Sequence, residues 1–250
     1  MRIALLADIH ANRQAFEACL AAAEAADAEQ FVLLGDYVGY GADPAWCVDR
    51  VRRLHENGAI VIRGNHDAAV ASGGAEISAM QSVAGQSVLW TRTQLDASQR
   101  AWLGELPLEH LDEDRYYVHA DASAPARWRY VEDPDDARAH FAACPARLSF
   151  CGHVHRPALY SQVPGERRVN RFAPATDYPL PLLPRRRWLT VAGSVGQPRD
   201  GDRSAAWCLL DTTRNALRFL RTPYDIDTAM ASIRAAGLPE VLAQRLAGGY

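Results

Sequence analysis

"RIALLADIH" (residues 2–10) opens the chain with a run of apolar residues that ends in an aspartate and a histidine. Such a short apolar run is typical of a strand that is buried on both faces. The pattern returns in "QFVLLGD" (30–36) and "AIVIRGNHD" (59–67), where each strand again runs into a polar turn. The segments between these strands, 12–27 and 44–58, have the apolar spacing of helices. Asn12 is a suitable N-cap for the first helix. The order β-α-β-α-β predicts parallel strands joined by right-handed crossovers.

The pattern of the chain changes near residue 157, where the helical spacing stops. Before this point we expect helices over 77–95, 98–106 and 133–144, and strands over 114–121 and 146–155. After it we expect mainly antiparallel strands over 158–164, 187–194, 205–213 and 216–222. Two helices within 224–250, broken at Gly237-Leu238-Pro239, end the sequence. We expect one domain over 1–250. Its Pro/Arg-rich stretch 167–187 is interpreted as a solvated excursion, with a flap or a partner surface as the alternative.

The composition excludes several classes of protein. A formal net charge of −3 with 23% charged residues argues against dedicated nucleic-acid binding, which usually needs a basic surface, and against disorder. No apolar run is long enough to predict a membrane span, and the first residues lack the long apolar region of a signal peptide. Five cysteines at scattered positions, without a C-x-x-C pair, fit a reducing compartment. We therefore expect a cytoplasmic protein.

Polar side chains follow the carboxyl ends of the predicted strands. They are Asp8, His10, Asp36, Asn65, His66, Asp67, His119, His153 and His155. In open α/β sheets ligands bind at this edge, so loops that are distant in the sequence can converge there. Imidazole, carboxylate and amide donors suit zinc, iron, manganese and related ions. The absence of a thiolate argues against a zinc-finger type of site. The set is too large for one catalytic zinc, whereas two ions that share a carboxylate would use it.

Five short motifs occur in order along the chain: "DIH" (8–10), "GDYVGYG" (35–41), "GNHD" (64–67), "VHAD" (118–121) and "GHVH" (152–155). Together they resemble the calcineurin-like metallophosphoesterase superfamily, from Met1 to at least the "GSVGQPRDG" loop (193–201). The variant "GDYVGYGADP" is similar to small YfcE-like and diadenosine-tetraphosphatase-like phosphoesterases of bacteria and archaea. The resemblance implies an α/β fold, a four-layer α-β-β-α sandwich of two mixed sheets. The metal site would lie at the C-terminal strand ends.

The resemblance also implies a role for each residue of the motifs. Two divalent or trivalent ions (manganese, iron, zinc, cobalt or nickel) would be held by two sets of residues and a bridge: Asp8, His10 and His155; Asn65, His119 and His153; and Asp36 between them. His66 would face the scissile phosphate as proton donor or charge stabiliser, and Asp67 would orient His66. The family commonly has a glycine where this chain has Ala120, which can alter the local turn.

Five further residues are candidates for substrate binding: Arg127, Arg129, Arg199, Tyr37 and Tyr40. A guanidinium fork matches phosphate, but an exposed strand or loop is the equal alternative for the three arginines. The two tyrosines can stack on a nucleobase or line a cleft, and packing under a loop is the equal alternative. Trp128 can stack in the same way, although aromatic residues are more often part of a core.

The remaining histidines leave two questions open. His119 competes with Asp121 as a metal ligand, because both follow the same predicted strand. His55, His110 and His140 lie on predicted helix or loop faces, and we expect all three to be solvated. Cys151, which directly precedes the last motif, is interpreted as a small buried apolar residue.

The leading functional hypothesis is a dinuclear metal-dependent phosphoesterase. It would hydrolyse phosphomonoester or phosphodiester bonds, of a nucleotide-like small molecule, by attack of metal-activated hydroxide. A Ser/Thr protein phosphatase is the enzymatic alternative, and a protein-binding scaffold with the same fold is the alternative from another class. The expected partner is a phosphate-ester substrate, with no dedicated nucleic-acid binding and no membrane association.

Overall fold

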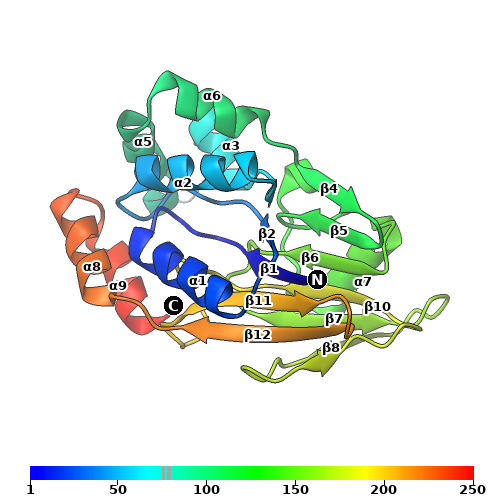
Figure 1. Cartoon of the computed structure of the whole chain (residues 1–250). Helices are drawn as coiled ribbons and strands as arrows, with labels where there is room; N and C mark the ends of the chain where they lie inside the picture. Colours follow the sequence, from blue (N-terminus) through cyan, green and yellow to red (C-terminus); the bar gives the residue numbers. More distant parts are fainter. Residues whose placement is uncertain (75–76, 78–79, 81) are drawn as a thin grey trace.

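Two β-sheets pack face to face, and helices cover the outer face of each (Figure 1). The structure is a computed structural model that describes the chain except for residues 75–76, 78–79 and 81. Within the described residues, the six strands of the first sheet follow the order β3 (Ile60–Val61), β2 (Gln30–Leu33), β1 (Arg2–Leu6), β11 (Ala205–Asp211), β12 (Ala216–Thr222) and β9 (Leu180–Pro181). The second sheet, counted in the same way, follows the order β4 (Glu109–Asp112), β5 (Arg115–Val118), β6 (Leu148–Cys151), β10 (Arg187–Val191), β7 (Ala158–Gln162) and β8 (Val169–Phe172).

The helices form the two outer layers. On the first sheet and against one another lie α1 (Arg13–Ala25), α2 (Pro44–Glu56), α3 (Asn65–Ser72), α5 (Ser82–Gln94) and α6 (Ala97–Glu105). The second sheet is covered by α7 (Pro134–Ala143), and a short 3₁₀ turn, η1 (Pro125–Arg127), precedes it. The chain ends in the paired helices α8 (Ile226–Ala235) and α9 (Glu240–Gly248), beside α1. The predicted four-layer α-β-β-α sandwich is therefore confirmed.

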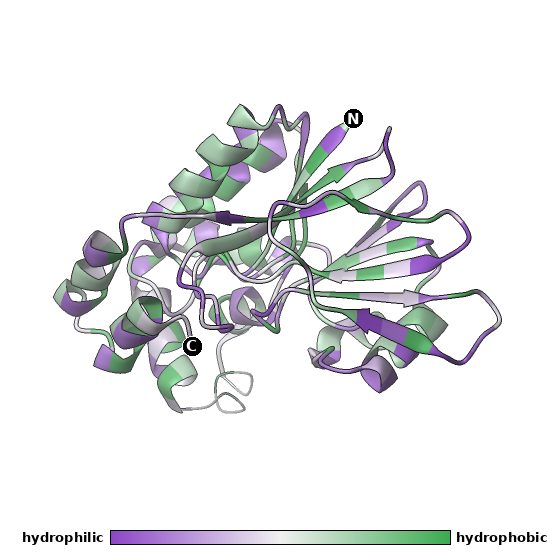
Figure 2. Cartoon of the chain, turned by 90° about the horizontal axis from the view of Figure 1, so that it is seen from below, coloured by the Kyte–Doolittle hydropathy of each residue, from purple (hydrophilic) through white to green (hydrophobic). Residues whose placement is uncertain are grey.

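Strand β1 explains why the first sheet needs a continuous apolar run. Successive side chains of a strand point to opposite faces of the sheet. Ala4 and Leu6 pack into the core under α1 and α2, whereas Ile3 and Leu5 pack into the core between the two sheets. Both faces of β1 are thus buried, and a polar residue on either face would lose its contact with water. Figure 2 shows the resulting hydrophobic strands, in green, in the interior.

The direction of the strands places their carboxyl ends at one edge. β1 pairs with β2, and β2 with β3, in parallel, as the β-α-β-α-β order predicts. β5 and β6 are also parallel. The expected antiparallel part is found in the pairs β10–β7, β7–β8 and β11–β12, but β10 pairs in parallel with β6. The motif loops therefore leave both sheets at the same end of the sandwich.

Several local predictions hold and others need correction. The Asn12 side chain accepts a hydrogen bond from the backbone N–H of Ala15 and caps α1, as expected. The "GNHD" stretch was expected to be a turn, but it begins the helix α3 at Asn65. Strand β4 was not expected at all. The expected helix over 77–95 is described from Ser82 onward, and part of its first turn lies outside the described residues.

The Pro/Arg-rich stretch 167–187 is more ordered than a solvated excursion. It supplies β8 at the edge of the second sheet and β9 at the edge of the first sheet, and then enters β10. Most of the stretch is exposed, in keeping with a solvated excursion, but its two short strands were not expected, because the apolar residues that pair are few and stand among prolines and arginines. No described helix is long and apolar enough to cross a membrane. All five cysteines are buried and unpaired, Cys151 in the core under α7.

His140 is the clearest correction among the histidines. His55 and His110 are exposed, as expected, but His140 is fully buried in α7. Its Nδ1 accepts a hydrogen bond from the backbone N–H of Ala122 at 3.2 Å, so the ring is neutral, although a carboxylate oxygen of Asp121 lies 3.7 Å from the same nitrogen. Burial, together with the positive charge of Arg187, lowers the pKa of His140 to about 3.

We predict that His140 makes the folded protein sensitive to acid. In the unfolded chain its pKa is about 6.5, so below this pH unfolding takes up a proton that the folded state does not bind. The free energy of unfolding should therefore fall by about 1.4 kcal/mol per pH unit more steeply in the wild type than in His140→Gln between pH 6 and 4. Denaturant unfolding of the metal-free protein measures these slopes. His110→Gln is the control and should keep the wild-type slope; equal slopes for wild type and His140→Gln would mean that His140 is protonated and paired with Asp121.

Candidate metal centre

The loops after β1 and β2 are joined by backbone hydrogen bonds. The N–H groups of Asp8, His10 and Ala11 donate to the carbonyl oxygens of Gly35, Asp36 and Tyr37, at 3.1, 2.9 and 2.9 Å. This ladder continues the pairing of the two strands beyond their ends. It places the side chains of the first two motifs next to each other, although they are separated in sequence by a whole helix.

A second set of bonds joins loops of different sheets. The N–H of His153, after β6, donates to both carboxylate oxygens of Asp8, after β1, at 3.1 and 2.9 Å. The N–H of Gly152 donates to the carbonyl oxygen of His119, after β5, at 2.9 Å. Asp8 is fully buried, so these bonds satisfy a carboxylate that water cannot reach.

Five of the expected ligands have strained backbones. Their φ angles lie in the left-handed region, from 49° to 66°: Asp8, His10, Asp36, His153 and His155. A residue with a Cβ pays about 1–3 kcal/mol for such a conformation, which persists only where the surroundings hold it. Strain of this kind is concentrated at functional sites, and here it turns five side chains toward one point.

The side chains form two clusters that share no residue and can each hold a metal ion, and a third group, His10, Asp36 and His66, overlaps both. In the first, donor atoms of Asp8, His10 and His155 all lie within 4.8 Å of one another. In the second, the same holds for Asp36, His119 and His153. All six residues are buried. Asn65 adds to the second cluster, because its Oδ1 lies 3.1 Å from His119 Nε2.

Asp36 lies between the two clusters. Its Oδ2 is 3.6 Å from His10 Nε2, in the first cluster, and 3.5 Å from His119 Nε2, in the second. Its other oxygen, Oδ1, accepts a hydrogen bond from the backbone N–H of His66 at 2.8 Å. One oxygen is thus fixed by the protein backbone, and the other faces imidazole nitrogens from both sides.

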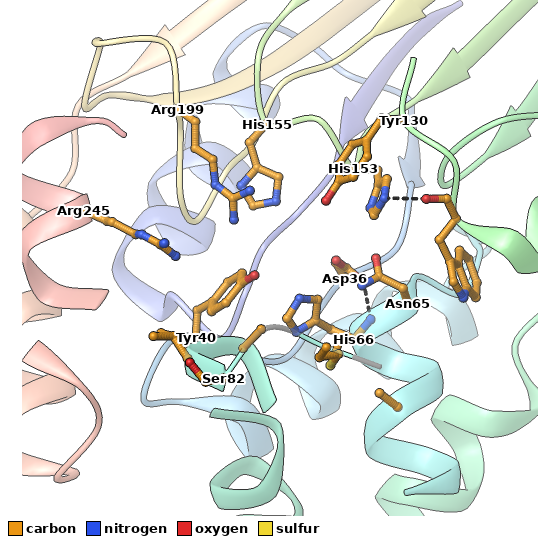
Figure 3. Close-up of a pocket in the computed structure, with 15 residues that line it drawn as sticks. Asp36, Tyr40, Asn65, His66, Ser82, Tyr130, His153, His155, Arg199 and Arg245 are labelled. Atoms are coloured by element: carbon orange, nitrogen blue, oxygen red, sulfur yellow. Dashed lines mark hydrogen bonds between the residues drawn. The ribbon is translucent and has the colours of Figure 1, made fainter. Parts of the chain in front are cut away.

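Each of the four clustered histidines is oriented by a backbone carbonyl. The Nδ1 atoms of His10, His119 and His155 donate to the carbonyl oxygens of Val38, Leu34 and Gln197, at 3.1, 2.7 and 2.7 Å. His153 uses the other ring nitrogen: its Nε2 donates to the carbonyl oxygen of Trp128 at 2.9 Å (Figure 3). A metal-binding histidine needs one nitrogen without a proton, and a carbonyl bound to the other nitrogen selects that tautomer. The residues therefore fit metal ions.

The charges of the clustered side chains respond to burial and to one another. Burial raises the pKa of Asp8 to about 8 and holds the pKa of His155 well below its usual value. Burial also opposes the charged form of His119, but the Asp36 carboxylate prevails and raises the pKa of His119 to about 9. The pKa of Asp36 is correspondingly low, because His119, His66 and His10 outweigh the effect of burial. Buried carboxylates this close together are stabilised by positive charge between them, which bound cations would supply.

Asp67 has a different set of partners from the one expected. Its carboxylate accepts hydrogen bonds from the backbone N–H groups of Asp36, Tyr37 and Gly64, at 2.8, 2.9 and 2.9 Å. These partners hold the Asp36 loop against the start of α3. Every hydrogen bond of Asp67 within the described residues is to backbone, so its carboxylate positions Asp36 and not the His66 ring.

The His66 ring lies next to both clusters. Its ring packs against Tyr40 and His10, with centroid distances of 4.5 and 4.9 Å. Gly39 leaves room for the ring, since a Cβ at this position would collide with His66 Nδ1. That nitrogen is buried and has no hydrogen-bond partner among the described residues. Burial lowers the pKa of His66, against the attraction of Asp36.

A cavity of about 420 Å³ opens onto the clusters (Figure 3). Its walls include Asp36, Asn65, His66, His153 and His155, together with Tyr40, Ser82, Trp128, Tyr130, Arg199 and Arg245. The volume lies within the range of small-molecule sites. The side chains labelled in Figure 3 surround one space, with the two arginines on the side opposite Tyr130.

Two of the expected substrate-binding residues line this cavity and three do not. Tyr40 and Arg199 line it. Tyr37 is fully buried, and its hydroxyl donates to the carbonyl oxygens of Leu33 and Ile62, so it packs under the loop. Arg127 and Arg129 are exposed and do not line the cavity.

Trp128 was recognised in the sequence as able to stack, but Tyr130 and Arg245, which also line the cavity, were not recognised. In the sequence, Trp128 lies between the two exposed arginines and Tyr130 follows the second. Both aromatic residues line the cavity, and the ring centroids of Tyr130 and His153 are 4.3 Å apart. Asp121, the alternative to His119, belongs to neither cluster, and its carboxylate accepts from Ser123. Arg245 carries no motif, and nothing in the sequence around it indicated the cavity.

Residues 1–215 match the calcineurin-like phosphoesterase superfamily domain. The chain belongs to this superfamily. As a member of the calcineurin-like phosphoesterases, it is a metal-dependent phosphoesterase and a hydrolase, and its substrate is a phosphate ester. The family implies divalent metal ions, in agreement with the two clusters.

Its relatives are similar along the whole chain. A metallophosphoesterase from Sphaerobacter thermophilus is 34% identical, with a TM-score of 0.87 over 100% of this chain and 99% of the other. An uncharacterized protein of Methanocaldococcus jannaschii is 32% identical over 98% of this chain and 96% of its own length. A hypothetical protein from Pyrococcus horikoshii, 18% identical, shares the fold with a TM-score of 0.81 over 100% and 98% of the two chains.

We predict that Asp36→Asn empties the metal centre of this phosphoesterase. Asparagine keeps an oxygen acceptor for the His66 N–H but places an amide NH₂ where Oδ2 faces His10 and His119. Metal content, measured by elemental analysis after gel filtration, should fall by more than half, and hydrolysis should be lost with it. Asp227→Asn, at an exposed position of α8, is the control and should keep both. Full metal content in Asp36→Asn would contradict the bridging position.

Proposed function

We propose that this phosphoesterase works with two metal ions and hydrolyses phosphate esters of a nucleotide-like small molecule. The observation that carries the proposal is the position of Asp36 Oδ2, within 3.6 Å of imidazole nitrogens from both clusters. A single carboxylate oxygen in this place suits a pair of ions better than one, because each cluster has its own set of donors.

The two ions would be divided between the clusters. Asp8, His10 and His155 would hold the first, whereas Asn65, His119 and His153 would hold the second. When bound, two such ions neutralise the phosphate oxygens and lower the pKa of a water molecule so that it can attack. The carbonyl-anchored histidines keep their donor nitrogens aimed at the centre, so little reorganisation is needed on binding.

His66 would act on the leaving group. It lines the cavity next to Asp36, and its Nε2 makes no hydrogen bond within the described residues, so this nitrogen is available to the substrate. Burial lowers its pKa in the free protein, and a phosphate anion next to the ring would raise that pKa again. His66 would then give its proton to the departing oxygen, or hold a phosphate oxygen by a charged hydrogen bond.

The shape of the cavity supports a small substrate. Tyr40, Trp128 and Tyr130 offer aromatic faces around it, which suit a nucleobase or a similar ring. The cations of Arg199 and Arg245 suit an anionic substrate. A phosphorylated protein segment would have to bring its backbone into a space of about 420 Å³ among buried histidines. We therefore favour a nucleotide-like phosphomonoester or phosphodiester over a Ser/Thr phosphoprotein.

We predict that His66→Ala slows hydrolysis without loss of metal. The loss of a proton donor should lower kcat by about 10²- to 10⁴-fold. Metal content should remain that of the wild type, because His66 is assigned to neither ion. Steady-state kinetics and elemental analysis on the same preparation measure both, with His110→Ala, an exposed histidine, as the control. Loss of the metal in His66→Ala would make His66 a ligand and overturn this assignment.

A substrate panel tests the proposed activity directly. After chelation and addition of manganese, p-nitrophenyl phosphate, bis(p-nitrophenyl) phosphate, a nucleotide and a phosphorylated peptide are compared by kcat/KM. We expect turnover of at least one small ester and at least about tenfold lower kcat/KM for the peptide. If the peptide is the best substrate, the protein-phosphatase alternative replaces the proposal. No turnover of any ester by metal-loaded protein would favour the scaffold.

A further inference from the structure

Two guanidinium groups enter the cavity from the same side. Arg199 comes from the loop between β10 and β11, and Arg245 comes from the last turn of α9 (Figure 3). Tyr130 lies on the other side of the cavity, stacked on His153 (Figure 3), and Trp128, whose carbonyl oxygen accepts from His153, also lines the cavity. The cavity is therefore divided into a cationic side and an aromatic side, with the metal clusters between them.

Neither guanidinium is neutralised by a carboxylate among the described residues. Arg199 donates to the amide oxygen of Gln197 at 2.9 Å, and its Nε is buried without a partner. Arg245 makes no side-chain hydrogen bond or ion pair within the same part of the chain, whereas Arg234 of the neighbouring α8 pairs with Glu240 at 2.7 Å. Unpaired positive charge in a cavity favours an anion.

The two cations lie at different distances from the metal clusters. The backbone N–H of Arg199 donates to the carbonyl oxygen of His155 at 3.1 Å, which places Arg199 beside the first cluster. Both arginines act on Tyr40, where they oppose the rise in pKa that burial causes. Arg199 Cζ lies 5.6 Å from the centre of the Tyr40 ring. Arg199 thus stands next to the clusters, and Arg245 stands beyond it, across Tyr40.

Arg245 has a rigid support. Leu242 and Leu246, on either side of it in α9, pack with Tyr40 in one hydrophobic cluster. The end of α9 is tied to the Arg199 loop, because the N–H of Gly201 donates to the carbonyl oxygen of Gly249 at 2.9 Å. The C-terminal end of a helix also favours a cation. Residue 245 lies beyond the segment 1–215 that matches the family model.

We propose that Arg245 binds a second phosphate of the substrate, linked to the phosphoryl group that reacts. The inference rests on the proposed function, since it takes the clusters as the place of reaction. The reacting phosphoryl group already has the metal ions, His66 and Arg199 around it. Arg245, which lies beyond Arg199, would contact the substrate only if a second anionic group of the substrate extended toward it. The preferred substrates are therefore compounds with two or more linked phosphates, such as a nucleoside diphosphate, and not simple monophosphates.

Calorimetric binding to the manganese-loaded protein tests the proposal without any need for turnover. The probes are AMP and α,β-methylene ADP, whose bridging carbon prevents cleavage between the phosphates. The wild type should bind the diphosphate analogue about 10- to 100-fold more tightly than AMP, as expected for charge-assisted hydrogen bonds to a second phosphate. Arg245→Gln should lose most of this preference while its affinity for AMP changes by less than about twofold. Arg245→Lys, which keeps the charge but not the fork, should retain part of it.

Arg234→Gln is the matched control, because it removes an exposed arginine from the same helical pair. It should keep the wild-type preference, and chelation of manganese by the analogue affects all variants equally. An unchanged preference in Arg245→Gln would overturn the proposal, as would an equal loss of AMP and analogue binding, which would place Arg245 on the reacting group. If the preference depends on Arg245 but no ester is hydrolysed, the proposed function fails and the binding inference stands.

Discussion

The centre of this protein depends on carboxylates that accept backbone N–H groups from neighbouring loops. Asp8 accepts from His153, Asp36 accepts from His66, and Asp67 accepts from Asp36, Tyr37 and Gly64. Each bond satisfies a buried negative charge and at the same time fixes a loop of strained backbone. The same few contacts thus hold two sheets together at one edge and set the positions of the metal-binding side chains. Any change that removes one of these acceptors acts on folding and on the site together.

The sequence was sufficient for the parts of the structure that obey local rules. β1 is apolar on both faces because it lies between two cores, and the motif residues follow strand ends because parallel strands share an edge. α3 escaped prediction because it is short and starts inside a motif, where Asp67 accepts from the backbone of Gly64. Tyr37 and Tyr40 lie in the same motif and could not be distinguished by sequence. Tertiary packing places Tyr37 in the core and Tyr40 at the cavity.

Contacts between distant segments explain the other failures. The sequence predicts an exposed helix face for His140, but in the structure the Ala122 backbone packs against its ring and donates a hydrogen bond to it. Arg245 meets the cavity only because α9 packs on Tyr40 and is tied to the Arg199 loop, which no local pattern encodes. The family's motifs therefore predict the chemistry common to the family, whereas we propose that residues from outside the motifs, such as Arg245, determine the choice of substrate.

The stretch 167–187 has a consequence for the behaviour of the protein at high concentration. It forms the last strand of both sheets, β8 on one and β9 on the other, and so occupies two edges where a foreign strand would otherwise pair. β9 is only two residues long and contains Pro181, which has no N–H to offer. Short edge strands with proline are a known protection against aggregation. At the edge formed by β9, the segment that looked like a solvated excursion thus offers a foreign strand little to pair with.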